Sequence, residues 1–368
     1  MVRIAIHRIG GPPVRAATAA REHVGSVGFR PFAVSCILLK DMYDLVIIGA
    51  GPAGLAAARD ARRLGLDVVV LDRGLVADTI HQFPIGKLLF STAEEIELAP
   101  GALVCRGPKP TREELLTHYT RFVVDEQLPV RCNEPVTHIE RTGEGFTVAT
   151  PSGTYRSRTV LMATGINGFR RHLNVPGESD ARVQYRFVEA YPYAGRPVLV
   201  AGSGNSAAEA ALFLEEVGAR VTLAMRRPSF DDDPRTGKPA VKWWVREPLE
   251  KLQAAGRLDV LFETTVAAIG DGTVDVESPL TGRRTLACDM VFALLGTMPD
   301  LSLLRACGVE IGEDGVPVYD RTTYETGVPG LYVAGHITHE RHIKGALAVA
   351  PRVVEHIARV LSADRTPA

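Results

Sequence analysis

The sequence predicts an α/β protein of two three-layer domains, each built on a parallel β-sheet. The chain has 368 residues, which is too long for one ordinary hydrophobic core and suits two domains. Residues 44–58 and 198–213 each read as a strand, a glycine turn and a helix. The strands of both segments are unbroken apolar runs, as in parallel sheets that are covered on both faces.

The first domain is expected to begin with a βαβ unit. An apolar strand over 43–49 runs into glycines, and 52–64 alternates Ala and Leu with Arg in helical fashion. A second buried strand follows over 67–71 and ends at Asp72. Farther on, the alternation of apolar and polar residues over 144–161 predicts a hairpin.

The second domain repeats this order of elements. A second βαβ unit is expected over 197–225, and another hairpin pattern falls within 273–293. A short apolar strand over 330–335 and a helix over 345–361 are expected to close the chain.

Composition and charge exclude several classes of function. Lys plus Arg number 42 and Asp plus Glu 43, so neither nucleic acid nor an anionic membrane is indicated as a partner. No apolar run reaches the length of a membrane span. The five cysteines form no Cys-x-x-Cys pair, which favours a cytoplasmic protein with neither a disulfide framework nor a metal site.

Residues 1–42 differ from the rest, because they are basic and show no clear apolar period. We expect them to be an extension, either unstructured or upstream of a true start at Met42. Their composition also has some likeness to a transit peptide.

The first glycine turn, residues 49–54, fits the pattern G-x-G-x-x-G. Gly49 permits the tight turn, Gly51 lets the backbone approach a pyrophosphate, and Gly54 lets helix and strand pack closely. The start of the helix offers free N–H groups and the positive end of its dipole to phosphates. Asp72 ends the following strand, where a carboxylate accepts hydrogen bonds from ribose hydroxyls. This segment is therefore predicted to be a Rossmann-like dinucleotide site.

The second turn, residues 202–207, is the variant of the pattern that ends in Ala. Its following strand ends at Arg226 and Arg227 rather than at an acid. An acid would repel a ribose 2′-phosphate, whereas two guanidiniums can pair with one, so NADPH is favoured over NADH. A redox enzyme with two such sites can hold a flavin in one and a nicotinamide in the other. The sequence therefore predicts hydride transfer from NADPH to a flavin, which then reduces an acceptor.

With these motifs in order, the chain resembles the flavin-dependent pyridine-nucleotide reductases of the thioredoxin-reductase-like type. Thr164-Gly165 and Gly296-Thr297 resemble the crossings between the domains of that group, and "GLYVAGHI" resembles its late flavin-binding strand. Over about residues 43–360 the chain further resembles the YpdA family of bacillithiol-disulfide reductases. The blocks that carry this resemblance are "FPIGKLLFSTAEEIEL", "KPTREELLTHY", "VLMATGINGFRRHLNVPGE", "VLVAGSGNSAAEAAL", "VFALLGTMPDLSLL" and "YETGVPGLYVAG".

The resemblance implies a discontinuous FAD domain, residues 43–188 and 293–368, into which an NADPH domain, residues 189–292, is inserted. It also implies FAD and NADPH as cofactors, and a homo-oligomer as the assembly. The implied acceptor is a low-molecular-weight disulfide such as bacillithiol disulfide, or a protein redox partner.

The motifs and the resemblance together assign residues to each site. The FAD site is expected to comprise Gly49, Ala50, Gly51, Pro52, Ala53, Gly54, Asp72, Arg73, Phe90, Ser91, Val136, Thr164, Gly165, Gly335 and His336. The NADPH site is expected to comprise Gly202, Ser203, Gly204, Asn205, Ser206, Arg226 and Arg227. Candidates for supplying protons or positive charge beside the flavin are His336, His339, His342 and Lys344. By the resemblance, Phe83 and Thr92 also pass along the flavin ring, whereas Trp243 and Trp244 are expected to anchor a helix.

Three departures from these families bear on the chemistry. Thioredoxin reductases carry Cys-x-x-Cys in the NADPH domain, and this sequence has none. The bacillithiol group has a cysteine just after the Gly-Pro of the first turn, where this chain has Ala53. His336 stands where thioredoxin reductases have Asp.

The cysteines themselves fall on no motif that would face the flavin. They are Cys36, Cys105, Cys132, Cys288 and Cys307. We expect them to behave as small hydrophobic residues rather than as nucleophiles. The flavin would then act on a disulfide directly, or a partner would bring the thiols.

Three other functions stay open at this point. A flavin monooxygenase also pairs two such turns, although its F-x-G-x-x-x-H signature is absent here. An electron-transfer module would dock ferredoxin or hold a second flavin in the second site. A non-catalytic redox sensor would bind nucleotide and signal to a partner.

Overall fold

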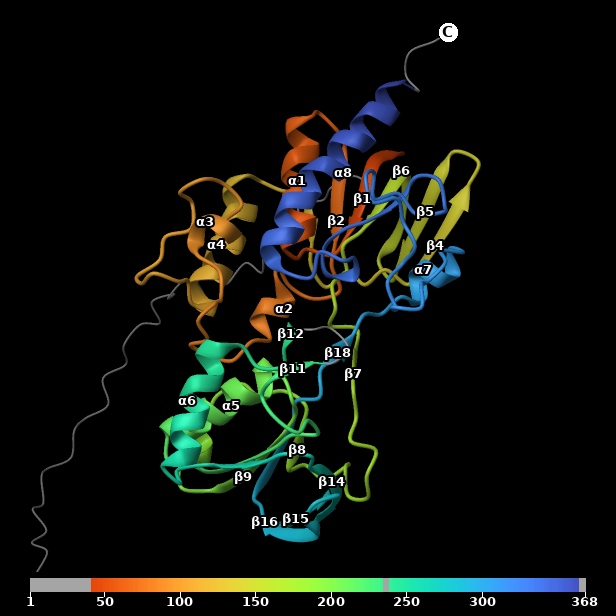
Figure 1. Ribbon diagram of the computed structural model, residues 1–368. Coiled ribbons are helices and arrows are strands. Elements are labelled where there is room, and N and C mark those ends of the chain that lie inside the picture. Colours follow the sequence, from red (N-terminus) through yellow and green to blue (C-terminus); the bar gives the residue numbers. More distant parts are fainter. Residues whose placement is uncertain (1–40, 234–237, 364–368) are drawn as a thin grey trace, which may run out of the picture. The chain divides into compact units, whose positions relative to one another are not determined.

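The computed structural model describes residues 41–233 and 238–363. The predicted extension over 1–42 therefore lies outside the described residues, apart from Asp41 and Met42. Two main β-sheets organise the described chain, and each glycine turn follows a central strand of one of them (Figure 1). Among the helices of these residues, none is long and apolar enough to cross a membrane.

The first sheet has seven strands and contains the first glycine turn. In sheet order they are β3 (Val130–Arg131), β2 (Val68–Leu71), β1 (Tyr43–Ile48), β6 (Gly153–Met162), β5 (Gly145–Thr150) and β4 (His138–Thr142), with β19 (Leu331–Val333) also paired to β6. β1, β2, β3 and β19 run parallel to the end of β6. The start of β6 instead pairs antiparallel with β5, which confirms the predicted hairpin.

Alternate residues of β1 point to opposite faces of this sheet. Leu45 and Ile47 share a core with α1 (Pro52–Arg63) and α8 (Ile343–Ala363), which lie side by side (Figure 1). Val46 and Ile48 share a second core with residues of β4, β5 and α7 (Ser302–Ala306). The first sheet is therefore covered on both faces, as its unbroken apolar strands predicted.

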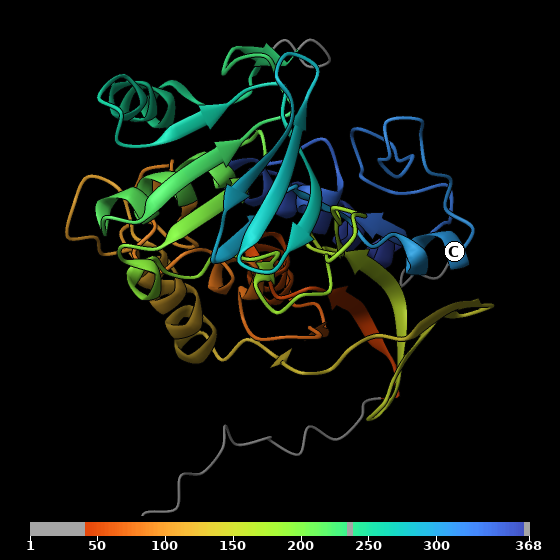
Figure 2. The same ribbon diagram turned by 90° about the horizontal axis from the view of Figure 1, so that it is seen from below.

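The second sheet has five parallel strands and contains the second glycine turn. In order they are β13 (Asp259–Leu261), β10 (Arg220–Ala224), β9 (Pro197–Ala201), β17 (Met290–Ala293) and β8 (Val183–Gln184). Val200 and Val221 pack toward α5 (Asn205–Glu216) and α6 (Trp243–Ala254) on one face. On the other face Leu199 packs against the antiparallel strands β14 (Thr265–Gly270), β15 (Thr273–Ser278) and β16 (Gly282–Ala287), coloured cyan in Figure 2.

Two short strands mark where the chain crosses between the sheets. β7 (Phe169–Arg170) pairs antiparallel with β18 (Thr297–Met298). Val183–Gln184 fall within the range expected for the first domain, but they form β8 because their backbone pairs with β17 of the second sheet. Ala293, expected in the returning part of the first domain, likewise belongs to β17. The domain limits at 188 and 293 stay predictions, while β8 and Ala293 pair within the second sheet.

Three helices follow β2 in the chain. They are α2 (Asp78–His81), α3 (Ala93–Ile96) and α4 (Arg112–Asp125). The remaining short elements are β11 (Asp232–Asp233), β12 (Lys238–Pro239) and the 3₁₀ helices η1 (Tyr191–Tyr193) and η2 (Gly335–Ile337).

The start of α4 holds the chain around residues 87–89. Thr111 and Glu114 form a capping box, in which the Thr111 hydroxyl accepts from Glu114 N at 3.2 Å. The backbone N–H of Arg112 donates to Lys87 O at 2.8 Å, and Leu89 N donates to Pro110 O at 2.9 Å. The capped start of α4 therefore holds the segment around Lys87 in place, and Lys87 lines both cavities described below.

Replacing Thr111 with Ala removes the side-chain acceptor at the start of α4. We expect the free energy of unfolding to fall by about 1 kcal/mol, as is typical for the loss of an N-cap, measured by urea denaturation. Thr117 lies exposed inside the same helix, so T117A keeps the cap and should change stability by less than about 0.5 kcal/mol. Equal losses in the two variants would contradict the role given to the cap.

Candidate dinucleotide sites

A first cavity of about 680 Å³ opens where β1 and β6 end. Its lining includes all residues assigned to the FAD site except Ala50 and Gly54. Phe83 also lines it, but Thr92 does not, because its side chain caps α3 instead. Segments that are far apart in the sequence, such as Phe90, Val136 and Gly335, thus meet in one cavity.

The three glycines of the first turn differ in the space around them, in the order that the motif predicts. Gly49 has φ +115°, and a Cβ there would lie 2.3 Å from Ala163 O. A Cβ on Gly54 would lie 1.9 Å from Gly49 O, so only glycine lets α1 pack against the turn. A Cβ on Gly51 would meet nothing within 4 Å, which leaves room for a ligand to approach the backbone.

Asp72 closes the turn from the next strand. Its carboxylate accepts from Ala50 N at 2.6 Å and from Gly74 N at 2.7 Å. Burial nevertheless raises the pKa of Asp72, although both hydrogen bonds act in the opposite direction. Beside it, the Arg73 guanidinium donates to Asn167 O. Asp72 therefore both fixes the turn and lines the cavity.

The residues around this cavity fit a flavin dinucleotide. α1 has Gly51 as its N-cap and no side-chain cap, so its first N–H groups remain to bind phosphate. Thr164 Oγ1 is buried and has no hydrogen-bond partner among the described residues. Thr164 lines the cavity, and such a buried polar atom calls for a ligand or water as its partner.

His336 differs from the expectation of a proton donor that titrates near neutral pH. His336 lines the cavity, and burial, with the nearby His342 and Arg341, lowers its pKa to about 4. It is therefore neutral near pH 7 and can offer only one N–H. Lys344 lines the cavity and pairs with Glu95 at 2.7 Å, and His342 lines it as well.

His339 does not line the first cavity. Its Nδ1 lies 2.9 Å from the hydroxyl of Tyr319, and its Nε2 lies 3.0 Å from Asp314 Oδ2. Arg321 contacts the same Nε2 at 3.1 Å. The side chain is thus held by the loop that precedes β19, which its position in the sequence did not indicate.

The two tryptophans at the start of α6 also differ from the expectation. Trp244 packs against the core of the second sheet and lines the first cavity, so it does more than anchor its helix. Trp243 is 68% exposed, so its side chain does little to anchor the helix.

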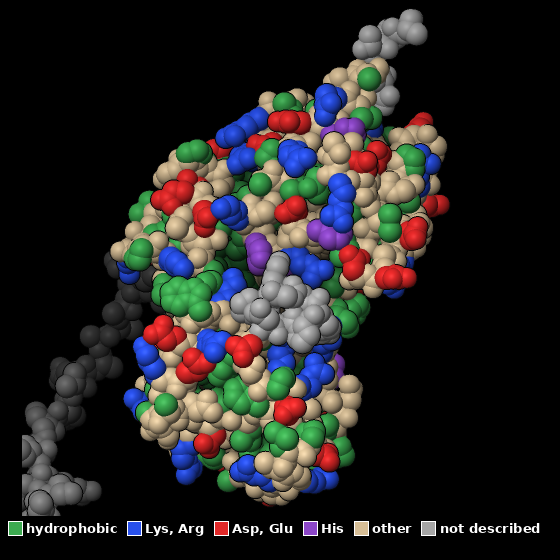
Figure 3. Space-filling view, in the orientation of Figure 1, with side chains coloured by type: hydrophobic (Ala, Val, Ile, Leu, Met, Phe, Trp, Pro, Cys, Tyr) green, Lys and Arg blue, Asp and Glu red, His purple; other side chains and the backbone are tan. Residues whose placement is uncertain are grey.

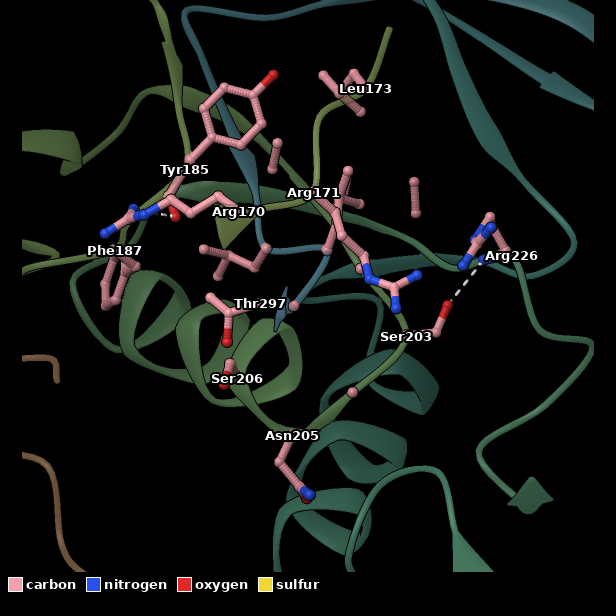
Figure 4. Close-up of a pocket in the computed structure, with 18 of the residues that line it drawn as sticks. Arg170, Arg171, Leu173, Tyr185, Phe187, Ser203, Asn205, Ser206, Arg226 and Thr297 are labelled. Atoms are coloured by element: carbon pink, nitrogen blue, oxygen red, sulfur yellow. Dashed lines mark hydrogen bonds between the residues drawn. The ribbon is translucent and has the colours of Figure 1, made fainter. Parts of the chain in front are cut away.

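A second cavity of about 1820 Å³ surrounds the second glycine turn, and every residue assigned to the NADPH site lines it. Gly202 has φ +156°, and a Cβ there would lie 2.5 Å from Leu294 O. A Cβ on Gly204 would meet nothing within 4 Å, as at Gly51. The turn is tied to the next strand by the hydrogen bond from Arg226 N to Ser203 Oγ, 3.0 Å long (Figure 4).

The arginines of the second cavity come from two places in the sequence. Arg226 is exposed and Arg227 half-buried, both at the end of β10 as predicted. Arg171 follows β7, and its guanidinium points toward Ser203 (Figure 4). Arg170 turns away and donates to Tyr185 O at 2.6 Å. Sequence reasoning missed Arg171, because only folding brings the crossing segment beside the turn.

The described thiols lie outside both cavities. None of the cysteines in 41–233 and 238–363 lines either of the two, and Cys36 lies outside the described residues. Burial raises the pKa values of Cys105, Cys132, Cys288 and Cys307. A raised pKa keeps a thiol protonated and unreactive.

The two cavities share one wall. The residues that line both are Thr79, Gln82, Phe83, Lys87, Phe90 and Asn167. Outside the cavities, the face in Figure 3 carries acidic and basic side chains interspersed, in keeping with the net charge of −1.

Two glycine variants separate packing from ligand binding. Gly51→Ala should leave the stability of the cofactor-free protein within about 1 kcal/mol of the parent, because the added methyl meets open space. The same methyl occupies the approach to the phosphates, so we expect much less FAD in the purified protein, measured from its visible absorbance. Gly54→Ala should instead destabilise the cofactor-free protein, seen as a lower melting temperature. A Gly51→Ala protein that retained full FAD would contradict the phosphate role of this turn.

Comparison with known proteins agrees with this geometry. Residues 46–335 match the family described as pyridine nucleotide-disulphide oxidoreductase. The bacilliredoxin reductase Bdr of Bacillus subtilis is 33% identical over 294 residues, covering 79% of this chain and 89% of its own length. A ferredoxin–NADP reductase of Ignicoccus hospitalis is 28% identical over 302 residues, covering 81% of this chain and 90% of its own.

A solved structure shows the same fold. The bacillithiol disulfide reductase Bdr (YpdA) from Staphylococcus aureus superposes with a TM-score of 0.80 at 30% identity, covering 89% of this chain and 100% of its own. These matches confirm the predicted resemblance, the two Rossmann-like domains, the reductase class and the cofactors FAD and NADPH. The chain belongs to the pyridine nucleotide-disulphide oxidoreductase family.

Proposed function

We propose that this protein takes electrons from NADPH through FAD and passes them to a low-molecular-weight disulfide, with bacillithiol disulfide as the first candidate. The observation that carries the proposal is the wall shared by the two cavities, which brings a flavin site and a nicotinamide site together. The net reaction consumes one NADPH and one proton for each disulfide that is converted to two thiols.

The first cavity supplies the groups that would hold the flavin. The start of α1 and Gly51 face the phosphates, Asp72 faces a ribose, and Thr164 Oγ1 offers an unpaired polar atom. When bound there, FAD supplies the two-electron chemistry that links the nicotinamide to the acceptor. Because its pKa is lowered to about 4, His336 is a neutral imidazole near pH 7. It can donate one hydrogen bond there, but it does not act as an imidazolium acid.

The second cavity supplies the groups that would select NADPH. Arg226 and Arg227 follow β10, where the 2′-phosphate of a bound nucleotide lies in Rossmann-type sites. Arg171 adds a third guanidinium from the crossing segment. Charge-assisted hydrogen bonds from guanidiniums favour the phosphate over a hydroxyl.

None of the thiols in the described residues lies where it could take electrons from the flavin. The four described cysteines lie away from both cavities and have raised pKa values. Ala53 lines the flavin cavity at the position where the resembled family has a cysteine. We therefore propose that the disulfide meets the flavin directly. The homo-oligomer and the cytoplasmic location expected from the sequence stay predictions.

A second candidate function is the reduction of ferredoxin. It is favoured by the relative from Ignicoccus hospitalis, which is named a ferredoxin–NADP reductase and is similar over most of both chains. Faster electron transfer to ferredoxin than to any disulfide would select this function.

The substrate proposal is tested by NADPH oxidation without oxygen. With bacillithiol disulfide present, we expect NADPH consumption and two new thiols per NADPH, counted with a thiol reagent. Replacing each of the four described cysteines with Ser should leave this rate within about twofold, because no thiol reacts in the scheme. NADPH oxidation without thiol release would reject disulfide reduction while leaving the reductase class intact.

The nucleotide preference has its own test. Replacing Arg226 and Arg227 with Ala should lower the preference for NADPH over NADH at least about tenfold, since a hydrogen bond to a charged group contributes roughly 1.5–3 kcal/mol. Arg284→Ala is the control, because Arg284 is exposed on β16 and lines neither cavity. The measurement is the ratio of kcat/KM for the two nucleotides. An unchanged ratio in the double variant would show that these arginines do not read the 2′-phosphate.

A further inference from the structure

We propose that three lysines beside the flavin cavity bind an anionic group of the electron acceptor, an inference that rests on the proposed reductase function. They are Lys87, Lys109 and Lys242, and they are referred to below as the lysine subsite. The acceptor that fits them is a small disulfide carrying a carboxylate or another anionic group.

Two aromatic rings hold the lysine subsite together. The rings of Phe90 and Trp244 meet edge to face with centroids 5.3 Å apart. Lys242 Nζ lies 4.6 Å from the Phe90 centroid and 5.0 Å from that of Trp244. Lys87 Nζ lies 4.9 Å from Phe90, and Lys109 Nζ lies 5.4 Å from Trp244. Cation–π attraction thus gathers three ammonium groups at one place.

The charges of this cluster are not balanced by the described side chains. Glu209 forms an ion pair with Lys87, and both side chains are largely buried. No ion pair to a described carboxylate is formed by Lys109 or Lys242. Burial, together with the positive charges of Lys109 and Lys87, lowers the pKa of Lys242, while Glu209 acts in the opposite direction. A bound anion would relieve this repulsion.

The neighbouring polar groups are also donors. Trp244 Nε1 is buried with no acceptor among the described residues, and an indole N–H can only donate. α6 starts beside it, with Lys242 as an N-cap that forms no side-chain cap and with no acid in the first turn. The positive end of the helix dipole therefore adds to the three ammonium groups. The indole N–H thus lacks an acceptor, and the positive charges around it favour an anionic one.

The location favours the acceptor over the two cofactors. Lys87, Phe90, Lys242 and Trp244 line the first cavity together with the flavin residues. Each dinucleotide already has a glycine turn for its own phosphates, so the lysine subsite is left for a third molecule. Lys87 is only 9% exposed, and the indole N–H is buried, so a small molecule reaches this place more readily than an acidic protein.

The test compares Lys242→Met with the control Lys251→Met in the FAD-loaded protein. Methionine keeps the length of the side chain and removes the charge. Lys251 lies on the same helix but is 73% exposed and pairs with Glu247. Each variant is assayed with dithiodipropionate, which is anionic, and with hydroxyethyl disulfide, which is neutral. Suberate, a dicarboxylate of similar length without a disulfide, is titrated by calorimetry.

We expect Lys242→Met to lower kcat/KM for dithiodipropionate and to weaken suberate binding about tenfold each, as for one lost charge-assisted contact. The kcat/KM for hydroxyethyl disulfide and the KM for NADPH should each stay within about twofold of the parent values. Lys251→Met should match the parent in all of these measurements. Lys109→Met, which changes no residue of the flavin cavity, should show the same pattern if Lys242→Met loses FAD.

Several outcomes would overturn the inference. A higher KM for NADPH with unchanged acceptor kinetics would assign the lysines to the nucleotide. A loss of activity in Lys242→Met that is seen only with an acidic ferredoxin as acceptor would assign the lysines to protein docking. Suberate binding that is absent or equal in all variants would remove the subsite. Suberate binding needs no turnover, so failure of both disulfides as substrates, with suberate binding intact, would refute the proposed function alone.

Discussion

The proposed electron path depends on the segment from Thr79 to Phe90, because residues of this segment line both cavities. It is held from both sides. On the side of the first sheet, Arg112 N donates to Lys87 O at 2.8 Å. On the other, Ile85 N donates to Val188 O at 2.8 Å, and Arg186 Nε donates to Gln82 O at 3.1 Å. A segment fixed in this way keeps the proposed nicotinamide site next to the proposed flavin site, and none of the described cysteines lines either cavity.

Local chemistry made part of this site predictable from the sequence. The roles of Gly49, Gly51 and Gly54 follow from the geometry of a strand, a tight turn and a helix, and each is visible in the space around its missing Cβ. The hairpin that ends in β6 was likewise predicted from alternation around Gly153. These features depend on neighbours in the chain, which a sequence displays directly.

The rest depends on burial and on contacts between distant segments, which a sequence does not display. His336 looked like a group that titrates near neutral pH, but burial takes its pKa to about 4. His339 looked like its companion, but Tyr319 and Asp314 hold it away from the cavity. The lysine subsite joins residues from three segments, and no spacing motif marks it. The sequence pattern therefore predicted the two glycine turns. The chemistry where the two cavities meet became visible only in the folded structure.

We propose that electrons pass from a nucleotide in the second cavity to a flavin in the first. The most direct measurement mixes the purified, FAD-containing protein with one equivalent of NADPH in the absence of oxygen and follows the visible absorbance of the flavin. We expect this band to bleach as NADPH is consumed in equal amount. A band that stays unchanged while NADPH binds would contradict the proposal.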